Sequence, residues 1–494
     1  MRWCTTGGAS RWGSSTAVIA SWRSRPPRRQ RWFANAGIVA DVDGDGHLDV
    51  VIGGYFPDGS RVLDPTATEP AVMQDSMSRA YNGGGKHFLL WHALAGDQVT
   101  YQEADAHLDD AVAHGWTLAL GARDLDGDLR PELYLANDFG PDRLLHNLST
   151  PGALRFERVE GRRGLTTPRS KVLGRDSFKG MGVDFGDVDR DGDDDLVVSN
   201  IVSPWALLER NFLFIHEGRP EQPAGPPGAP PGTPPGTPID GARFVDHAEP
   251  LGVSLGGWAW DVRFGDFDDD GWLEIVQANG FVQGEADRWP DLQELATSND
   301  VLLHRPGAWP HFTRGDDLSG RQRNRFFTRT GDEPFADVAA QLGLPAADVS
   351  RGLATGDLDD DGDLDLVVAN QWEDSQVLVN EAPRRNRAVW LRLQLPVSAG
   401  PLRVEPGSRA LGSPAIGAAV AITLPDGTRL RQQVDGGAGH SGKSAPVIHV
   451  GLGALAGDPA LPVTIDYRDR TGAVRRVTTA VHAGSWTIVL GGSP

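Results

Sequence analysis

Residues 357–370 read DLDDDGDLDLVVAN, and close variants of this stretch recur along the chain of 494 residues. Every copy has Asp at positions 1, 3 and 5, an acid at position 9 and an aliphatic residue at position 10. A supersecondary unit that recurs in this way is typical of propellers and solenoids. The four other copies, which align without gaps, are DVDGDGHLDVV from Asp41, DLDGDLRPELYL from Asp124, DVDRDGDDDLVV from Asp187 and DFDDDGWLEIV from Asp266.

These Asp-rich loops have the donor pattern of a calcium site. Acids at alternate positions, followed by Gly at position 6, let the chain curl until the carboxylates converge, and the position 7 carbonyl and position 9 carboxylate complete the oxygen shell. Oxygen donors favour Ca²⁺ over zinc or copper, and Mg²⁺ loses its waters reluctantly. We therefore expect up to five Ca²⁺. The expected ligands are Asp41, Asp43, Asp45, His47 and Asp49; Asp124, Asp126, Asp128 and Glu132; Asp187, Asp189, Asp191, Asp193 and Asp195; Asp266, Asp268, Asp270, Trp272 and Glu274; and Asp357, Asp359, Asp361, Asp363 and Asp365.

An EF-hand and a plain turn are two alternatives to a strand-flanked calcium loop. An EF-hand needs a carboxylate at position 12 and flanking helices, whereas the five residues there are uncharged and lie in apolar, β-branched runs. Plain turns also favour Asp and Gly, but a turn does not require acids at positions 1, 3, 5 and 9. The Asp124 loop is expected to be weak or empty, because it has Leu129 instead of Gly at position 6 and Pro131 at position 8.

More than the loop repeats, and the spacing fits blades with insertions. Short apolar segments follow the loops, and most precede an aromatic-led segment. We expect strands at HFLLW (87–91), RLLHN (143–147), FLFIHEG (212–218), VLLHRPG (301–307) and VLVNE (377–381), and aromatic-led segments from Tyr101, Phe156, Phe244 and Phe335. The prediction is an all-β protein: a calcium-binding propeller of about six or seven blades over residues 33–383. Residues 219–239, rich in Pro and Gly, should form an exposed insertion loop.

Charge and composition narrow the function. The formal net charge is −20, and 25 of the 67 acidic residues lie in the five loops, where a cation could neutralise them. Nucleic acid is therefore not an expected partner. The one cysteine, Cys4, allows no intramolecular disulfide, and no apolar stretch reaches the length of a membrane span. Residues 1–32 read as a disordered leader or a wrongly assigned start, since their apolar run is too short for a signal peptide.

The loops, with their Phe and Asn strand signatures, resemble the FG-GAP/VCBS repeats of integrin-α-like propellers. That resemblance implies one Ca²⁺ per loop between the strands of a blade. Residues 388–492 lack Asp loops and alternate as antiparallel strands do, so a small β-sandwich-like domain is expected. Within them AIGAAVAI from Ala415, DGGAGHSGKSAPVIHVGLG from Asp435 and VTIDYRDRTG from Val463 are similar to the ASPIC/UnbV domain, which follows a VCBS propeller in the cartilage acidic protein family. The Trp-Pro-x-Gly turn of that family is missing here.

A phosphate-binding loop is an alternative interpretation of GAGHSGKS (437–444), but this stretch lies between two expected strands and Pro446 blocks a following helix. No nucleophile elbow or HExxH pair occurs in the sequence, so no catalytic residue is assigned.

The sequence is compatible with two functions. The first is a non-catalytic, calcium-stabilised, monomeric binding or adhesion module that is extracellular, periplasmic or on the cell surface, with a protein or glycan ligand. The second is an exported polysaccharide-active hydrolase or lyase that uses the propeller as its scaffold.

Overall fold

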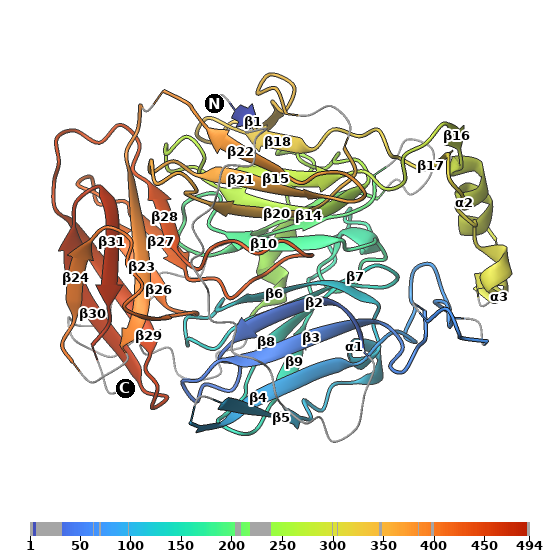
Figure 1. Cartoon of the computed structure of the whole chain (residues 1–494), viewed down its shortest axis with the longest axis horizontal. Coiled ribbons are helices and arrows are strands. Elements are labelled where there is room, and N and C mark those ends of the chain that lie inside the picture. The colour runs from blue at the N-terminus through green and yellow to red at the C-terminus, as the bar shows by residue number, and fades with distance from the viewer. Residues whose placement is uncertain are drawn as a thin grey trace.

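The computed structural model describes residues 3–5, 32–62, 64–68, 71–96, 98–202, 209–217, 239–298, 300–303, 305–344, 348–383, 385–396 and 400–491. Most of the expected leader, residues 6–31, and nearly all of the Pro/Gly-rich insertion, residues 218–238, lie outside these ranges. Figure 1 shows stacked sheets next to a separate sandwich of strands at the C-terminal end. No helix within the described ranges is long and apolar enough to span a membrane.

Five antiparallel sheets of four strands, together called the ring, are arranged as propeller blades. The first three sheets follow chain order: β2 (Phe33–Ala40), β3 (Asp49–Phe56), β4 (Lys86–Ala95) and β5 (Gln98–Ala104); β6 (Thr117–Arg123), β7 (Glu132–Asn137), β8 (Arg143–Asn147) and β9 (Phe156–Val159); β10 (Gly182–Gly186), β11 (Asp195–Ser199), β12 (Phe212–His216) and β13 (Phe244–Asp246). The fourth contains β14 (Ala259–Gly265), β15 (Glu274–Asn279), β18 (Arg325–Thr328) and β19 (Ala336–Asp337). The fifth contains β20 (Ser350–Gly356), β21 (Asp365–Asn370) and β22 (Gln376–Asn380), with β1 (Trp3–Thr5) at its outer edge.

The innermost strands of successive sheets contact one another in the order β2, β6, β10, β14, β20. Apolar clusters fill the spaces between sheets; one of them packs Ile38 and Phe88 of the first sheet against Leu120 and Leu133 of the second. The all-β propeller prediction is confirmed, with one sheet for each Asp-rich loop in the described part of the chain. The described residues form five of the six or seven blades expected, and two long insertions, at 57–85 and 280–324, account for part of the wide spacing between the loops.

The second insertion explains a wrong strand prediction. Residues 301–307 were expected to form a strand, but α3 (Asp300–Leu303) and a short 3₁₀ turn (Pro306–Ala308) lie there. The insertion also carries α2 (Trp289–Ala296) and the short parallel pair β16 (Ala286–Asp287) and β17 (Asp316–Asp317). Its apolar residues, Trp289 and Leu303 among them, pack onto the ring. Within α3 only Leu303 is buried, whereas Val301 and Leu302 are exposed. The third strand of the fourth sheet is β18. The first sheet is likewise followed by a short helix, α1 (Asp110–Ala113).

Residues 388–491, which we call the C-terminal domain, form a two-sheet sandwich around one apolar core. One sheet contains β24 (Arg403–Pro406), β31 (Gly484–Val489), β23 (Ala388–Pro396), β25 (Gly412–Pro414) and β28 (Ile448–Gly451); the other contains β27 (Arg429–Gln433), β26 (Ala419–Thr423), β29 (Leu461–Arg468) and β30 (Val474–Val481). All pairs are antiparallel except β23 with β31. The β-sandwich prediction is confirmed.

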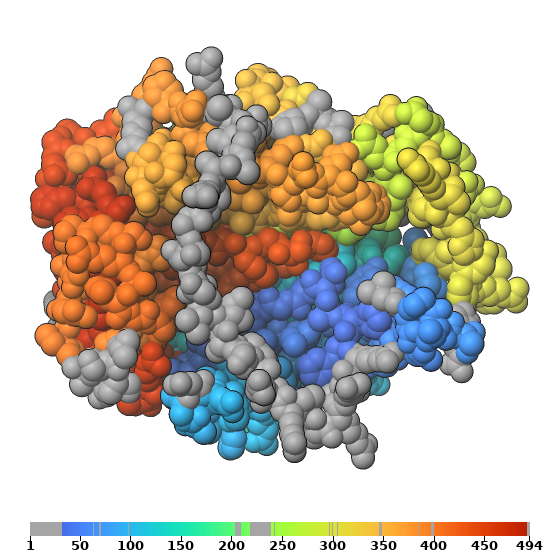
Figure 2. Space-filling model, in the orientation of Figure 1, coloured from blue at the N-terminus to red at the C-terminus, as the bar shows by residue number. Residues whose placement is uncertain are grey.

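A glycine-rich segment of this domain, residues 435–446 between β27 and β28, enters the centre of the ring (Figure 1). Its backbone pairs with β2 and β20, the first and last inner strands, through Val39 N–H to Gly436 O (3.2 Å) and Ala445 N–H to Thr355 O (3.3 Å). Gly439 forms an antiparallel bridge with Leu120 of β6. In Figure 2 this segment, in dark orange, lies between the fifth sheet and the blue first sheet. Residues 435–446 therefore occupy the propeller channel. They are followed by the strand β28 and not by the helix that a phosphate-binding loop requires.

Candidate metal centres

Each Asp-rich loop connects the innermost strand of a sheet to the second strand. Position 6 has a left-handed backbone in all five, with φ of 90° at Gly46, 94° at Gly192, 85° at Gly271, 94° at Gly362 and 64° at Leu129. Glycine adopts this conformation without steric cost, so the loop geometry explains four of the five residues. The backbone of the Asp124 loop nevertheless follows the other four.

The first Asp of each loop organises the turn. Its Oδ2 accepts the backbone N–H of position 6 in every copy, with distances of 2.9, 2.9, 3.0, 2.8 and 3.1 Å from the first loop to the fifth. The carboxylates thereby converge, and in four loops three acids bring one oxygen each within 4.8 Å of one another. These triads are Asp41, Asp43 and Asp45; Asp124, Asp126 and Asp128; Asp187, Asp189 and Asp195; and Asp266, Asp268 and Glu274.

The expected ligands outside these triads occupy the same loops. Asp191 and Asp270 hold position 5 in the third and fourth loops, where position 9 completes the triad instead. In the fifth loop the Asp361 N–H donates to Asp357 Oδ1 (3.0 Å) and Asp359 Oδ1 (3.2 Å), so it folds in the same way. Position 7 was expected to offer its carbonyl. Its N–H donates to the position 5 carboxylate at His47 (2.7 Å), Asp193 (2.9 Å), Trp272 (2.7 Å) and Asp363 (3.0 Å).

The position 9 acid is a buried link that joins the second strand to the Asp-rich loop and to the third strand. Asp195 is fully buried; its Oδ2 accepts the Val188 N–H (2.8 Å) and its Oδ1 accepts the His216 N–H (2.9 Å) from the third strand. The acids of the other loops accept equivalent bonds, the second coming from a side chain in the fourth loop: Asp49 from Val42 and Trp91; Glu132 from Leu125 and Asn147; Glu274 from Phe267 and the Thr328 hydroxyl; and Asp365 from Leu358 and Asn380. The acid therefore anchors the loop to its sheet.

The loops concentrate negative charge out of water. Burial raises the pKa of Asp41 to about 7 and the pKa of Asp49 to about 8. Burial, then the neighbouring carboxylates, raises the pKa of Asp187 to about 7 and the pKa of Asp266 well above its usual range. Asp187 Oδ1 and Asp266 Oδ1 are buried and accept no hydrogen bond from the described residues. A bound cation would supply the compensation that burial of such oxygens requires.

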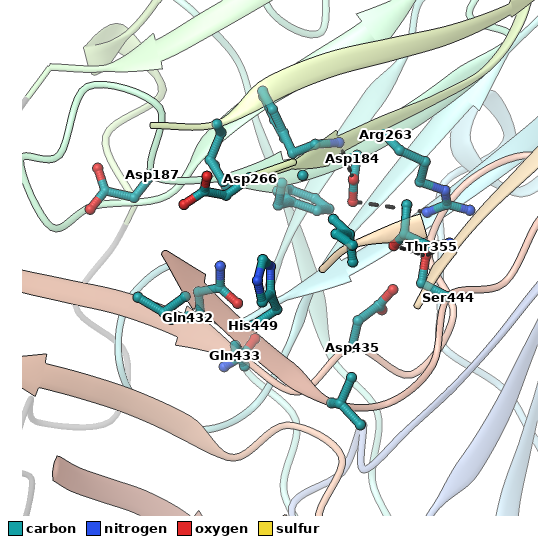
Figure 3. Close-up of a pocket in the computed structure, with 18 of the residues that line it drawn as sticks. Asp184, Asp187, Arg263, Asp266, Thr355, Gln432, Gln433, Asp435, Ser444 and His449 are labelled. Atoms are coloured by element: carbon teal, nitrogen blue, oxygen red, sulfur yellow. Dashed lines mark hydrogen bonds and ion pairs between the residues drawn. The ribbon is translucent and has the colours of Figure 1, made fainter. Parts of the chain in front are cut away.

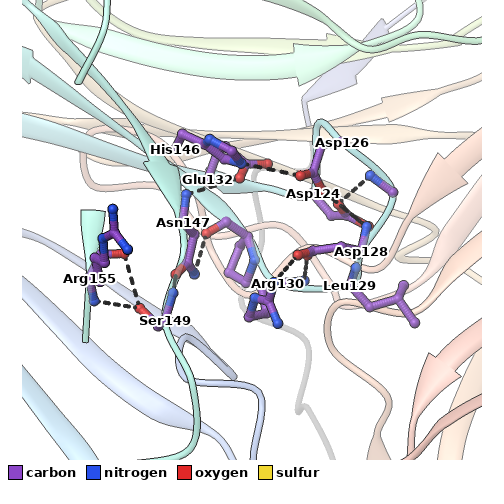
Figure 4. A network of polar contacts seen from close by, with 12 residues as sticks. Asp124, Asp126, Asp128, Leu129, Arg130, Glu132, His146, Asn147, Ser149 and Arg155 are labelled. Carbon is purple, nitrogen blue, oxygen red and sulfur yellow. Dashed lines mark hydrogen bonds and ion pairs between the residues drawn. The ribbon is translucent and has the colours of Figure 1, made fainter. Parts of the chain in front are cut away.

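In the Asp124 loop, two protein side chains pair with the carboxylates (Figure 4). Asp128 pairs with the Arg130 guanidinium. Asp126 Oδ2 lies 3.2 Å from His146 Nε2, and the side chains of Asp126 and His146 are each 4% exposed. Burial and the neighbouring carboxylates raise the pKa of Asp124 to about 7. A metal at Asp128 would compete with Arg130, whereas His146 is itself a possible ligand beside Asp126 and Glu132. The weak site expected at this loop stays a prediction.

The C-terminal domain covers the loop-bearing face, which the sequence did not indicate. A cavity of about 150 Å³ remains between ring and domain (Figure 3). Asp187 and Asp266 line it from the loops, and Gln433 and His449 line it from the domain. His449 Nε2 lies 2.9 Å from Asp269 Oδ1. No repeat or motif marks the loop-contacting residues of this domain, so only the structure identifies them.

Comparison with known proteins agrees with these two parts. The model of the FG-GAP-like repeat matches residues 124–198, and the model of ASPIC and UnbV matches residues 408–489. Cartilage acidic protein 1 of Xenopus tropicalis is 26% identical over 461 residues, which cover 86% of this chain. The chain spans 60% of the length of that relative. A solved tetra-tandem repeat from the extending region of a large adhesion protein is 10% identical over 91% of this chain and 99% of its own, and its TM-score of 0.11 is too low to relate the two folds.

Proposed function

We propose that this FG-GAP-repeat protein with a C-terminal ASPIC/UnbV domain is a calcium-stabilised extracellular module that binds a protein or glycan partner without catalysing a reaction. The relative named cartilage acidic protein 1 supports a place outside the cell. There, calcium is abundant enough to fill sites of the affinity found in extracellular modules. Carboxylates that hold a metal are poor general acids, which supports a binding role.

The observation that carries the metal assignment is the buried, unpaired oxygen in two converged carboxylate triads. Asp187 Oδ1 and Asp266 Oδ1 have no donor in the described structure, although burying an ionised oxygen without a partner is costly. Each lies in a triad whose oxygens are close enough to share one ion. Carboxylates with no sulfur donor suit Ca²⁺.

Calcium removal is the direct test. A ligand that binds only the folded state stabilises it by about 2.7 kcal/mol per site at 100 times its Kd. We expect EDTA to lower the melting temperature by many degrees and added Ca²⁺ to restore it in a calorimetric scan. An unchanged melting temperature, together with no Ca²⁺ uptake in titration calorimetry, would contradict the proposal.

Single-loop variants test the location of the ions. The double substitution Asp187→Asn and Asp189→Asn should remove one strong site from the Ca²⁺ stoichiometry while the other loops still bind. Asp105→Asn is the matched control, because the Asp105 side chain is 78% exposed and lies outside the loops. An unchanged stoichiometry in the double variant would place the ion elsewhere.

The partner is proposed to bind on the face opposite the C-terminal domain. The C-terminal domain covers the loop-bearing face, whereas the insertions at 57–85 and 280–324 project from the other side (Figure 1). Binding residues commonly lie on loops of this kind. A glycan array with product analysis tests the ligand class: bound and intact glycan supports the binding module, and cleaved glycan would favour a polysaccharide-active enzyme.

A further inference from the structure

The C-terminal domain contacts every one of the five Asp-rich loops. The contacts are Arg468 Nε to Asp41 Oδ2 (3.6 Å), Asp124 N–H to Gln433 Oε1 (3.1 Å), Arg431 Nη1 to Gly192 O (2.9 Å), Gly451 N–H to Asp266 Oδ2 (3.1 Å) and Trp390 Nε1 to Gly362 O (2.9 Å). The domain makes one more contact with the backbone of the fourth loop, from Gly453 N–H to Asp269 O (2.8 Å), and the Asn386 side chain, just before the domain, donates to Asp268 O (2.8 Å). Apart from residues 435–446, which contact the inner strands, the domain thus docks on the candidate metal loops.

Most of these contacts end on the loop backbone or on a predicted ligand, so they depend on the loop conformation. The approach is close: a Cβ atom on Gly46 would lie 2.1 Å from Asp469 O, and one on Gly451 would lie 2.0 Å from Asp266 Oδ2. A loop that changed its curl would lose its acceptor carbonyl or would collide with the domain. Docking therefore needs all five loops in one shape at the same time.

Without a cation, that shape brings like charges together. In the third and fourth loops the first Asp lies in a triad of acids whose oxygens are within 4.8 Å of one another, and Asp266 also accepts a docking hydrogen bond. A Ca²⁺ ion would hold the carboxylates and, through them, the turn that presents the docking carbonyls. The ion and the C-terminal domain therefore stabilise the same loop conformation from opposite sides.

We propose that calcium in the Asp-rich loops holds the C-terminal domain on the propeller, and that calcium loss releases the domain while the sheets persist. This rests on the proposed calcium binding. Release withdraws residues 435–446 from the channel and breaks the bonds that Asp261 of β14 accepts from His440 N–H (3.1 Å) and Gly442 N–H (3.2 Å). It also frees Arg263, which donates to Ala438 O and Gly442 O (2.6 Å each).

The first test measures docking with and without metal in the full chain. Hydrogen exchange at residues 436–446 should rise at least tenfold in EDTA, while exchange in the buried strand β11 stays slow. Spin labels at Leu165→Cys and Thr478→Cys, both exposed positions, in a Cys4→Ser background should give one narrow distance in Ca²⁺ and a broad distribution in EDTA.

The second test uses reciprocity. If calcium strengthens docking, weaker docking must weaken calcium binding by the same factor. Trp390→Phe removes the N–H donor to the fifth loop, and Arg431→Met removes the donor to the Gly192 carbonyl of the third loop. Each substitution should raise the Ca²⁺ Kd about fivefold or more. Trp486→Phe and Arg476→Met are the matched controls, because their partners, His482 O and Asp466, lie within the C-terminal domain. The controls should leave the Kd unchanged.

The outcomes separate this inference from the calcium assignment. Absence of Ca²⁺ binding in the unmodified chain contradicts both. Normal binding with unchanged exchange at 436–446 and an unchanged spin-label distance after chelation contradicts the docking proposal alone. If chelation unfolds the sheets as well, the reciprocal test decides, and equal Kd values for the docking variants and their controls would overturn the proposal.

Discussion

At the scale of the residue, Leu129 combines an unfavourable backbone conformation with a favourable burial of its side chain. Its left-handed backbone, with φ of 64°, is where the other loops have glycine. The side chain is 7% exposed and lines a cavity shared with Ile416 and Pro414 of the C-terminal domain. A left-handed L residue costs about 1–2 kcal/mol, and burying a leucine contributes about 1.5–3 kcal/mol. Burial between ring and domain therefore offsets the backbone cost, which explains a residue that the loop pattern alone makes anomalous.

Leu129→Gly is expected to destabilise the protein by about 1–2 kcal/mol in urea unfolding, although it restores the loop consensus. The lost burial and the greater freedom of glycine in the unfolded chain together exceed the relieved strain. Leu165→Gly is the control, since Leu165 is fully exposed, and it should change stability by less than about 0.5 kcal/mol. A more stable Leu129→Gly variant would show that the strain outweighs the packing.

At the scale of the element, an asparagine at the end of the third strand ties one blade to the loop before it. Asn147, which ends β8, donates to Val42 O of the first loop (2.9 Å). Asn380, which ends β22, donates in the same way to Phe267 O of the fourth loop (2.7 Å). Val42 and Phe267 both hold position 2, so the tie repeats with the blade. Both asparagines are buried, which makes the bond a structural link between neighbouring sheets.

Asn380→Ala should lower the free energy of unfolding by about 1–2 kcal/mol, because it removes a buried hydrogen bond to the Phe267 carbonyl. The control is Asn35→Ala, whose exposed amide donates across sheets to Leu118 O at a longer 3.3 Å. Urea midpoints at an unchanged slope measure both losses. Equal losses of unfolding free energy in the two variants would mean that the buried hydrogen bond contributes no more to stability than the exposed one.

At the scale of the whole molecule, the acids of several loops act together on stability. In the metal-free chain, burial raises the pKa of Asp41, Asp124 and Asp187 to about 7 and that of Asp49 to about 8, from the ordinary 3.8. The folded state then binds more protons than the unfolded state between about pH 4 and 8. Deprotonation therefore costs the metal-free fold stability as the pH rises through this window.

In EDTA, the melting temperature should fall as the pH rises from 5 to 8. The free energy of unfolding should drop by about 1.4 kcal/mol per pH unit for each extra proton held by the folded state. In saturating Ca²⁺ the slope should reverse, because protons then compete with the ion for the same carboxylates. Calorimetric scans across this range, with and without Ca²⁺, check both signs. Identical slopes in the two conditions would show that the ion does not bind these acids.

The sequence by itself determined the five loops, their shared turn and the sheets beside them. It could do so because the decisive contacts are local: the first Asp binds the N–H of position 6, and the position 9 acid binds the N–H of position 2. The strands of the C-terminal domain could be predicted because their alternation of apolar and polar residues is also a local signal.

Only the tertiary structure decided how these parts meet. It replaced the expected strand at 301–307 with a helix, placed β1 beside β22 and put residues 435–446 into the channel. Arg468 reaches Asp128 O across 340 positions of sequence. Such contacts depend on which surfaces the folded sheets bring together, and no local spacing in the chain encodes them.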